Sequence, residues 1–524
     1  MKDVLDALST GLIFVVPLVI SAGAAVISVG AAWHGLLFKR DSRAALGWVV
    51  VCLALPVIGA IFYFMFGINR VRARAQRLRG ERRRWFVDFE RGFRPQQVIG
   101  EEIPDNVISD SAASGPGQVA DPNCTVGIAR AAATVTGRPL SENNRVSILR
   151  NGEQAFPAML AAIADARHSI FLSTYIFENN QTGLIFVQAL QAALDRGVEV
   201  RVVVDGMGAW YSRGIIGALR KAGINTRRFN APRIALPTMA LNLRNHRKIL
   251  LVDNHIAFAG GMNIGDRHLL GQAENNTPTA DIQFCFEGPV LTQLADVFAD
   301  TWRIGGDQAS NDQALPELPV QASTVNADTV KADAVKESNR PYTSACRAIA
   351  DGPDDNLDKL ALIFVAAMDS AQHSIRIMTP YFLPSQGMIA ILQSAALRGL
   401  QVSIVLPAKN NLSYVHWATR NMLWELLSCG VKVYYQPGVF VHTKLLLIDD
   451  AYALVGSANI DPRSLRLNYE LGVEIYDQAV VAELIGDFEE AVGRSAPITQ
   501  QVLDERSLLE RTRDAVCWLV SPYL

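Results

Sequence analysis

Two segments of this chain repeat one order of residues that could carry chemistry. The first reads NHRKILLVDNHIAFAGGMN from residue 245, and the second reads VHTKLLLIDDAYALVGSAN from residue 441. Each contains His-x-Lys and a later Asp, and each runs through a glycine-containing turn into Asn. One His-x-Lys would mean little, because a solvated strand edge explains it. Two copies in matched order are hard to explain by packing and indicate a shared function.

The spacing of His and Lys places the two side chains on one face. Alternate residues of a β-strand share a face, so His246 and Lys248 point the same way. His442 and Lys444 repeat this spacing. Asp253 completes the first motif, but it lies seven residues after its histidine and has the opposite parity.

The candidate catalytic set includes both motif aspartates, Asp253 and Asp449. Their parity favours bracing the turn or the other face of the strand over attack on a substrate. Each segment ends in an amide, Asn263 or Asn459, that lies 17 residues after its histidine and could return beside the lysine. Two acids that follow the segments, Asp281 and Glu470, could orient an imidazole.

These groups together suit a phosphodiester substrate. One neutral histidine can attack phosphorus and become a phosphohistidine, while the other, protonated, protonates the leaving oxygen. Free histidine titrates near about 6.5, so both forms are accessible at neutral pH. The lysines, with Asn263 and Asn459, would bind the non-bridging phosphate oxygens. We therefore expect neither a metal nor another cofactor.

An internal repeat provides the elements that must position these residues. ARHSIFLSTYIF at residue 166 matches AQHSIRIMTPYF at 371, and ALDRGVEVRVVVDG at 193 matches AALRGLQVSIVLPA at 395. Helical segments alternate with short β-branched runs in each copy, which predicts an α/β fold with a covered sheet. The sequence therefore predicts two similar α/β lobes.

Composition sets wider limits. The chain has 524 residues, of which half are hydrophobic, and a net charge of −2. This length suggests two or three domains, and the charge gives no overall preference for nucleic acid. The six cysteines form no CxxC pair, which argues against a zinc site or a disulfide scaffold.

The first seventy residues differ from the rest. Two apolar runs, 11–38 and 44–67, each reach the roughly 20 residues that a membrane-spanning helix needs, and predict a membrane hairpin. A cleaved signal peptide is the alternative, with a candidate site at 22–24. It is disfavoured because the first run continues past that site and a second run follows. Eight arginines between residues 70 and 84 indicate a cytoplasmic side and would attract anionic lipids.

We therefore expect five regions. They are a transmembrane hairpin (1–70), a basic juxtamembrane segment and connector (71–135), a first lobe (136–304), a polar linker (305–340), and a second lobe with a C-terminal helix (341–524).

The two segments resemble the HKD motifs of the phospholipase D superfamily. The likeness extends to GGMNIGDRH at 260, TPYFLPSQGM at 379 and GSANIDPRSLRLNYELGVEIYD at 456, and the hairpin and the C-terminal segment are similar to those of bacterial cardiolipin synthases. It spans nearly the whole chain except about 95–135 and 305–340. The resemblance implies two pseudo-symmetric phospholipase D-like lobes, each an α/β/α sandwich, after the hairpin.

The resemblance also implies an activity. One phosphatidylglycerol would give its phosphatidyl group to His246 and release glycerol, and a second would take it to form cardiolipin, with His442 as general acid and base. The residues alone do not break the symmetry between the two histidines. Thr443 departs from the Ala of many family members. Expected partners are phosphatidylglycerol, cardiolipin and anionic lipids at a bacterial inner membrane, with cytoplasmic lobes, no nucleic acid and homo-oligomerisation left open.

Several alternatives stay open at this stage. The acceptor could be water or another alcohol, which would make the protein a phospholipase D or a different phosphatidyltransferase. A nuclease would need a basic groove near the motifs, and an inactive scaffold would be expected to lack a motif residue. Aromatic residues near the motifs could line an acyl groove or pack in the core; they are Tyr175, Phe177, Trp210, Tyr381 and Phe382. The C-terminal helix could pack on the lobes or lie on a membrane.

Overall fold

The structure is a computed structural model that describes residues 2–39, 41–68, 75, 122–230, 242–272, 275, 277–305 and 343–521. The arginine cluster, the connector before residue 122 and the linker after residue 305 lie outside the described residues. The chain divides into two compact units, which are described separately. The N-terminal helices belong to one, and the described residues from 122 onward, apart from Asn242, belong to the other.

The N-terminal unit begins with one long apolar helix. Helix α1 spans Lys2–Phe38, and its segment Val19–Phe38 is long and apolar enough to cross a membrane. Helix α2 (Ser42–Ala54) follows after a short turn. Asp41 caps α2, because its side chain accepts hydrogen bonds from the backbone N–H groups of Arg43 and Ala44.

The second apolar run is not one continuous helix. It is divided into α2, α3 (Ile58–Phe62) and a π-helical turn, η1 (Tyr63–Gly67). The interruption falls at Pro56, since proline lacks the N–H that continues a helix and holds the residue before it in an extended conformation. Of the two predicted spans, only the first is therefore a single membrane-length helix among the described residues.

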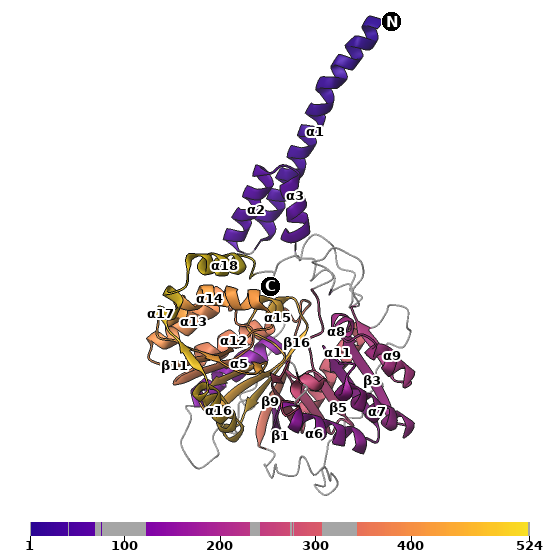
Figure 1. Cartoon of the computed structure of the whole chain (residues 1–524), viewed down its shortest axis with the longest axis vertical. Helices are drawn as coiled ribbons and strands as arrows, with labels where there is room; N and C mark the ends of the chain where they lie inside the picture. The colour runs from indigo at the N-terminus through magenta and orange to yellow at the C-terminus, as the bar shows by residue number, and fades with distance from the viewer. Residues whose placement is uncertain are drawn as a thin grey trace. The chain divides into compact units, whose positions relative to one another are not determined.

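The second unit is built around one mixed sheet of fifteen strands (Figure 1). In spatial order these are β17 (Ala496–Ile498), β12 (Lys432–Gln436), β11 (Gln401–Pro407), β10 (Ser374–Met378), β14 (Leu445–Ile448), β15 (Tyr452–Gly456), β16 (Glu470–Tyr476), β9 (Ser344–Asp351), β1 (Ser141–Arg150), β8 (Ile282–Glu287), β6 (Ile256–Gly260), β5 (Ile249–Val252), β2 (Ser169–Thr174), β3 (Glu199–Asp205) and β4 (Asn225–Phe229).

The strand order is pseudo-symmetric about its centre. From β1 outward the first lobe reads β1-β8-β6-β5-β2-β3-β4, and from β9 outward the second lobe reads β9-β16-β15-β14-β10-β11-β12. The antiparallel pair β1 and β9 joins the lobes, and Figure 1 shows these strands side by side between them. Arg150 on β1 adds a cross-lobe ion pair to Asp487, with Nε and Oδ1 2.7 Å apart. The two predicted lobes thus share one sheet.

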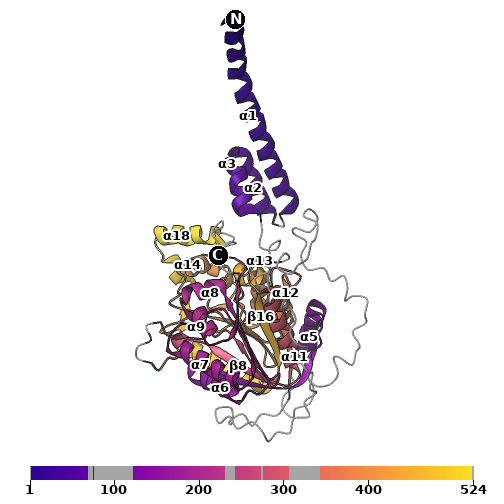
Figure 2. The ribbon, with the colours of Figure 1, turned by 90° about the vertical axis from the view of Figure 1, so that its right-hand side faces the viewer.

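Helices cover both faces of the first lobe. Helices α6 (Asn151–Asp165), α7 (Gln181–Asp195) and α9 (Ile215–Lys221) pack on one face, where alternate residues of β2, β3 and β5 are buried. Helix α11 (Val290–Ile304) covers the other face, and its Phe298 stacks on Phe171 of β2. Figure 2 shows these helices on opposite sides of β8. The lobe therefore has three layers.

The second lobe repeats this arrangement. Helices α12 (Lys359–Ser370), α13 (Gln386–Leu397) and α14 (Ser413–Leu427) pack on one face, and α16 (Gln478–Gly493) contacts the other. Helix α5 (Pro122–Thr136), which lies within the predicted connector, packs on α12, as Figure 2 shows.

The C-terminal helix α18 (Leu508–Leu519) packs on α14 of the second lobe. Its Asp514 is fully buried and forms an ion pair with Arg506, with Oδ2 and Nη1 2.8 Å apart. Leu508 and Leu509 of the same helix remain largely exposed. The lobe contact is therefore observed, and an apolar part of the helix is left accessible.

Candidate active site

Each histidine segment pairs with a backbone segment of the opposite lobe. In the second copy, β13 (Phe440–Val441) forms a small sheet with β7 (Thr279–Ala280), and His442 N donates to Ala280 O at 2.7 Å. In the first copy, His246 N donates to Tyr469 O at 2.9 Å. The residue after each acceptor carbonyl is an acid, so each histidine is placed beside a carboxylate of the other lobe.

Both predicted acids contact an imidazole across the lobe boundary. His246 Nδ1 lies 2.9 Å from Glu470 Oε2, and His442 Nδ1 lies 2.8 Å from Asp281 Oδ2. Both carboxylate side chains are fully buried, while both imidazoles are 12% exposed. With Nδ1 held in this way, Nε2 is the ring nitrogen left for a substrate.

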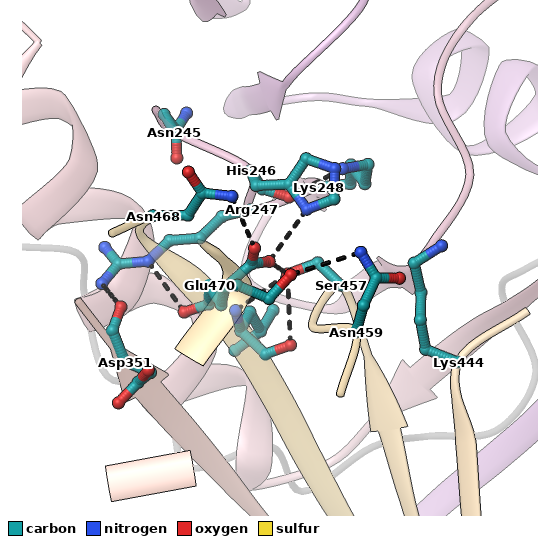
Figure 3. Close-up of polar contacts among 12 residues, drawn as sticks. Asn245, His246, Arg247, Lys248, Asp351, Lys444, Ser457, Asn459, Asn468 and Glu470 are labelled. Carbon is teal, nitrogen blue, oxygen red and sulfur yellow. Dashed lines mark hydrogen bonds and ion pairs between the residues drawn. The ribbon is translucent and has the colours of Figure 1, made fainter. Parts of the chain in front are cut away.

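Glu470 is held by donors on three sides (Figure 3). Besides His246, it accepts hydrogen bonds from Ser457 Oγ at 2.5 Å and from Asn468 Nδ2 at 3.1 Å. Burial opposes ionisation of Glu470, but His246, Lys248 and Ser457 outweigh it and lower its pKa below the ordinary value. Glu470 is therefore ionised at neutral pH.

Asp281 has a different environment. It accepts from the backbone of Ile282 at 2.9 Å as well as contacting His442. Gly261 stands where the other lobe has Ser457, and a Cβ at Gly261 would lie 2.7 Å from Asp281 Oδ2. Asp281 therefore lacks the hydroxyl donor that Ser457 gives Glu470 at the equivalent position. Burial raises the pKa of Asp281, and the Lys444 charge only partly opposes this.

The two lysines lie within electrostatic reach of both imidazoles. Lys248 Nζ donates to His246 O at 2.8 Å, and Lys444 Nζ donates to His442 O. Burial and the neighbouring Lys444 lower the pKa of Lys248 to about 7 although Glu470 opposes this, and burial lowers that of Lys444 to about 8. Burial and both lysines lower the pKa of His246 and His442. The four groups therefore form one electrostatic cluster.

The two asparagines return beside the cluster with different partners. Asn263 Oδ1 accepts from Ile176 N at 3.1 Å, whereas Asn459 Nδ2 donates to Ser464 Oγ at 3.2 Å. Both residues are buried. Within the described residues no protein acceptor is found for Nδ2 of Asn263, so this N–H₂ group is available to a ligand.

His268 supports Asn263, a role that sequence reasoning missed. Its Nε2 accepts from Asn263 N at 3.3 Å, and its Nδ1 lies 3.2 Å from Thr279 O. Burial lowers the pKa of His268 to about 3, so the ring is neutral and can accept at one nitrogen while donating at the other. The signal in the sequence was its repeat position, which matches Ser464, the partner of Asn459.

The motif aspartates lie apart from the cluster and bind backbone N–H groups, as the bracing role that their parity favours would require, and their place in the catalytic set stays a prediction. Asp253 accepts from the backbone N–H groups of Arg167, His168 and Ser169 at 2.7–2.8 Å. Asp449 accepts from three equivalent N–H groups, those of residues 372–374, at 2.8–3.1 Å. Each aspartate follows the strand that comes after its histidine, β5 or β14, and ties the end of that strand to the loop before the neighbouring strand, β2 or β10.

An ion pair behind His246 was also missed. Asp205, at the end of β3, accepts from Asn245 N at 2.8 Å and forms an ion pair with Arg244 at 3.4 Å. Both side chains are almost fully buried. The pair fixes the backbone that precedes His246; the second lobe has Pro407 and Phe440 at these repeat positions.

Two of the five aromatic residues pack in the core, and for the other three the acyl-groove role stays a prediction. Phe177 and Phe382 are buried in the core. The Tyr175 ring packs edge-on against the His246 ring at 5.0 Å, and Trp210 is 56% exposed. Tyr381 lies beside Phe440, which contacts the His442 ring.

In the described part of the chain, no three His, Cys, Asp or Glu side chains gather as a metal site would require.

Comparison with known proteins places the chain in a family. A family model described as "Cardiolipin synthase, PLD-like domain" matches residues 159–302 and 364–492, one match in each lobe and together more than half of the chain. A second, described as "Phospholipase_D-nuclease N-terminal", matches residues 26–67.

Relatives extend this likeness over nearly the full length. A cardiolipin synthase of a Geobacillus species is 30% identical over 93% of this chain and 90% of its own, and cardiolipin synthase 1 of Bacillus cereus is 29% identical over 95% and 94%. The crystal structure of phosphatidylserine synthase from Haemophilus influenzae shares the fold, with a TM-score of 0.55 and 14% identity over 76% of this chain and 100% of that one. The chain belongs to the cardiolipin synthase family of phospholipase D-like proteins.

Proposed function

We propose that this protein is a phosphatidyltransferase that makes cardiolipin from two phosphatidylglycerols and releases glycerol through a phosphohistidine. The observation that carries the proposal is the paired site, in which two imidazoles are each held by a buried carboxylate of the opposite lobe and accompanied by a lysine. Relatives that carry the name cardiolipin synthase over nearly the full length support the choice of substrate.

His246 is the nucleophile in this proposal. The asymmetry of the two carboxylates supports the assignment, because Glu470 is ionised and can hold the proton of His246 on Nδ1. The lone pair of Nε2 is then free to attack phosphorus. The Nε2–P bond forms, the bond from phosphorus to the glycerol oxygen breaks, and His442 gives a proton to that oxygen.

The second half of the reaction reverses these roles. The free hydroxyl of another phosphatidylglycerol attacks the phosphohistidine, the new O–P bond forms and the P–Nε2 bond breaks. His442 takes the proton of the attacking hydroxyl, which returns it to the state that began the cycle. His246 leaves as a neutral imidazole, again hydrogen-bonded to Glu470.

The phosphate itself prepares the acid. Burial and the lysines disfavour the charged form of His442. A bound phosphodiester brings a negative charge beside Lys248 and Lys444, and an opposite charge favours the protonated imidazole. The lysines and Asn263 bind the non-bridging oxygens in this proposal, and the bound phosphate adds to the negative charge that ionised Glu470 already supplies.

The membrane supplies the acceptor in this proposal. Helix α1 and the segment after it form a membrane anchor, and the arginine cluster keeps the lobes on the cytoplasmic side. The exposed Leu508 and Leu509 of α18 add an apolar contact with the lipid surface. High local acceptor concentration and exclusion of water favour transfer over hydrolysis.

The test is to reconstitute the purified chain with phosphatidylglycerol as the only lipid, with and without a chelator, and to identify the products. Cardiolipin and free glycerol in equal amounts, unaffected by the chelator and abolished by His246→Ala, are expected. Phosphatidic acid as the main product would instead make the protein a phospholipase D. Turnover only after a different lipid alcohol is added would retain the chemistry and replace the acceptor.

A further inference from the structure

The two lobes carry an arginine at the same repeat position, with different surroundings. GGMNIGDRH in the first lobe aligns with GSANIDPRS in the second, so Arg267 corresponds to Arg463. The backbone agrees with this alignment, since Glu178 N donates to Ile264 O and Leu383 N donates to the equivalent carbonyl of residue 460. Positions 178 and 383 are therefore equivalent as well.

Arg267 is neutralised within its own lobe. Its Nε donates to Glu178 Oε1 at 2.6 Å, and its Nη2 contacts the same oxygen. Glu178 has room for this because Gly265 lacks a side chain; a Cβ at Gly265 would lie 2.1 Å from Glu178 Oε2. The Arg267 guanidinium is thus paired with the Glu178 carboxylate of its own lobe.

The second lobe has no carboxylate at the position equivalent to Glu178, so Arg463 lacks this partner. Leu383, which is buried, replaces Glu178, and Asp461 replaces Gly265. Asp461 directs Oδ1 to Ser464 N at 2.7 Å, where it caps helix α15 (Pro462–Arg466). Within the described residues the half-buried Arg463 side chain forms neither an ion pair nor a hydrogen bond. The charge of Arg463 acts on Asp461, but Asp461 directs its oxygen to Ser464 N and does not pair with the guanidinium. A partly desolvated guanidinium without a direct ion pair can bind an anion.

The position of Arg463 connects it to the reaction. Its charge acts on Tyr175 of the first lobe and on Tyr381 of the second, opposing in both the rise in pKa that burial causes. Tyr175 packs against the ring of His246. The residue after Arg463, Ser464, accepts from Asn459 Nδ2 at 3.2 Å, so Arg463 lies on the segment that adjoins the catalytic cluster.

The proposed reaction requires a second anion site at such a place. The phosphodiester that reacts is bound by Lys248, Lys444 and Asn263. A phosphatidylglycerol that acts as acceptor brings another phosphodiester, which stays intact and lies only one glycerol bridge from the reacting phosphorus. That negative charge must be paired when it enters a partly buried site. Water and neutral alcohols bring no such charge.

Building on the proposed function, we propose that Arg463 binds the unreacting phosphodiester of the acceptor lipid and thereby selects a phospholipid alcohol over water or a neutral alcohol. Its planar guanidinium can donate two parallel hydrogen bonds to the non-bridging oxygens. Arg463 takes no part in bond making, and His442 accepts the hydroxyl proton from either kind of acceptor. It is a specificity residue of the transfer step.

The experiment measures how one phosphoenzyme is partitioned between two acceptors. The full-length protein is supplied with phosphatidylglycerol and a neutral long-chain alcohol, and the ratio of cardiolipin to phosphatidyl-alcohol is measured. Arg463→Gln is expected to lower this ratio at least about tenfold, because one charge-assisted hydrogen bond discriminates by that order. Formation of phosphatidyl-alcohol and exchange of labelled glycerol into phosphatidylglycerol should stay within about twofold of wild type.

Because both products come from the same intermediate, the ratio does not depend on how much enzyme is folded. Arg463→Lys should restore part of it. Arg466→Gln is the matched control, since Arg466 lies on the same helix and pairs with Asp358; its ratio should equal that of wild type. An unchanged ratio in Arg463→Gln, or an equal loss of both products, as expected if Arg463 binds a neighbouring headgroup of the bilayer, would overturn the proposal. Failure of the proposed function would appear earlier, as wild-type enzyme that makes no cardiolipin.

Discussion

The two lobes share a backbone plan down to single hydrogen bonds, yet their halves of the site differ in chemistry. Asp253 and Asp449 accept from three equivalent N–H groups each, so the scaffold is symmetric. The carboxylates are not, because Glu470 gains the Ser457 hydroxyl while Asp281 faces the bare Gly261.

This difference shows where a repeated fold can specialise. The segments that place the histidines, just before β5 and β14, have the same backbone plan in both lobes, and the residues that contact the histidines' carboxylates differ. Burial alone raises the pKa of a carboxylate, and the number of donors around it decides whether that rise persists. The charges of His246 and Lys248 together with the Ser457 hydroxyl lower the pKa of Glu470, whereas burial keeps the pKa of Asp281 raised, so the two histidines face carboxylates that ionise with different ease.

The largest expected effect on activity comes from replacing either histidine, and it distinguishes the roles of the two. His246→Ala should lower cardiolipin formation by more than about a thousandfold, since no phosphoenzyme forms. His442→Ala should lower it about 10²–10⁴-fold through loss of the general acid. The decisive measurement uses a phosphatidyl ester of p-nitrophenol, whose leaving group needs no proton.

With that ester, His442→Ala should release a burst of p-nitrophenol and accumulate phosphoenzyme, whereas His246→Ala should release none. The opposite pattern would assign the nucleophile to the second lobe.

The next effect concerns the carboxylates behind the histidines. Glu470→Gln should place an N–H against His246 Nδ1 and force the ring proton onto Nε2, which removes the nucleophilic lone pair. We expect a loss of about 10²–10⁴-fold in the p-nitrophenol burst rate, by analogy with the loss of a correctly oriented tautomer in other enzymes. Asp281→Asn should retain the burst and slow the later transfer, because only His442 is affected.

Thermal unfolding distinguishes the same two variants. The folded-state pKa of Asp281 is raised, so ionised Asp281 costs stability, and that cost grows as pH rises from about 3.8 through the folded pKa. Asp281→Asn removes the cost and should raise Tm at neutral pH by about 2 °C or more. The folded-state pKa of Glu470 is lowered, so its ionised form stabilises the fold at every pH above the ordinary pKa of a glutamate. Glu470→Gln removes this stabilisation and should lower Tm. Equal shifts of one sign would refute this asymmetry.

The lysines should give a moderate effect that depends on pH. Only the charged amine attracts phosphate, and the pKa of Lys248 is about 7 and that of Lys444 about 8. We therefore expect kcat/KM for phosphatidylglycerol to fall as pH rises through this range, with kcat changing less because bound phosphate keeps the amines protonated. Lys248→Arg should remove the earlier part of the fall and Lys444→Arg the later part. A profile that neither variant alters would assign it to another group.

The smallest expected effect on turnover tests the symmetric part of the comparison. Asp253→Asn and Asp449→Asn should each change kcat less than about threefold, because neither carboxylate contacts the imidazole cluster. Each should lower Tm by about 2 °C or more, since charge-assisted hydrogen bonds to three N–H groups are weakened. A loss of activity at unchanged Tm in either variant would place that aspartate in the catalytic set.

Much of the site could be predicted from residue order and the period of two of a strand. His246 and Lys248 lie together although both come just before β5 and not on it, Asp253 just after β5 is turned away, and the repeat indicated two lobes. The sequence could not show that each acid serves the histidine of the other lobe, because this depends on pairing across more than 150 residues. It also missed His268, whose role appears only once Thr279 and Asn263 are close.

In the apolar N-terminal region, the sequence predicted the apolar runs but not how they divide into helices. Hydropathy identified both apolar runs, but composition does not reveal how Pro56 divides the second one into separate helical pieces. The joining of two lobes into one sheet was equally hidden, since β1 and β9 are separated in the sequence by the whole first lobe and the linker.

Each acid contacts the histidine of the other lobe, and this has a consequence for the independence of the two halves of the chain. Neither half of the chain could work alone, because each lacks the carboxylate that orients its own imidazole. Since β1 pairs with β9 and Arg150 with Asp487, two separately expressed halves would be expected to reassemble and complement each other. A substitution at Glu470 harms the step performed by the other half. Because each acid contacts the histidine of the other half, substitutions in the two halves are coupled, and the chain resembles a heterodimer whose two subunits are covalently joined.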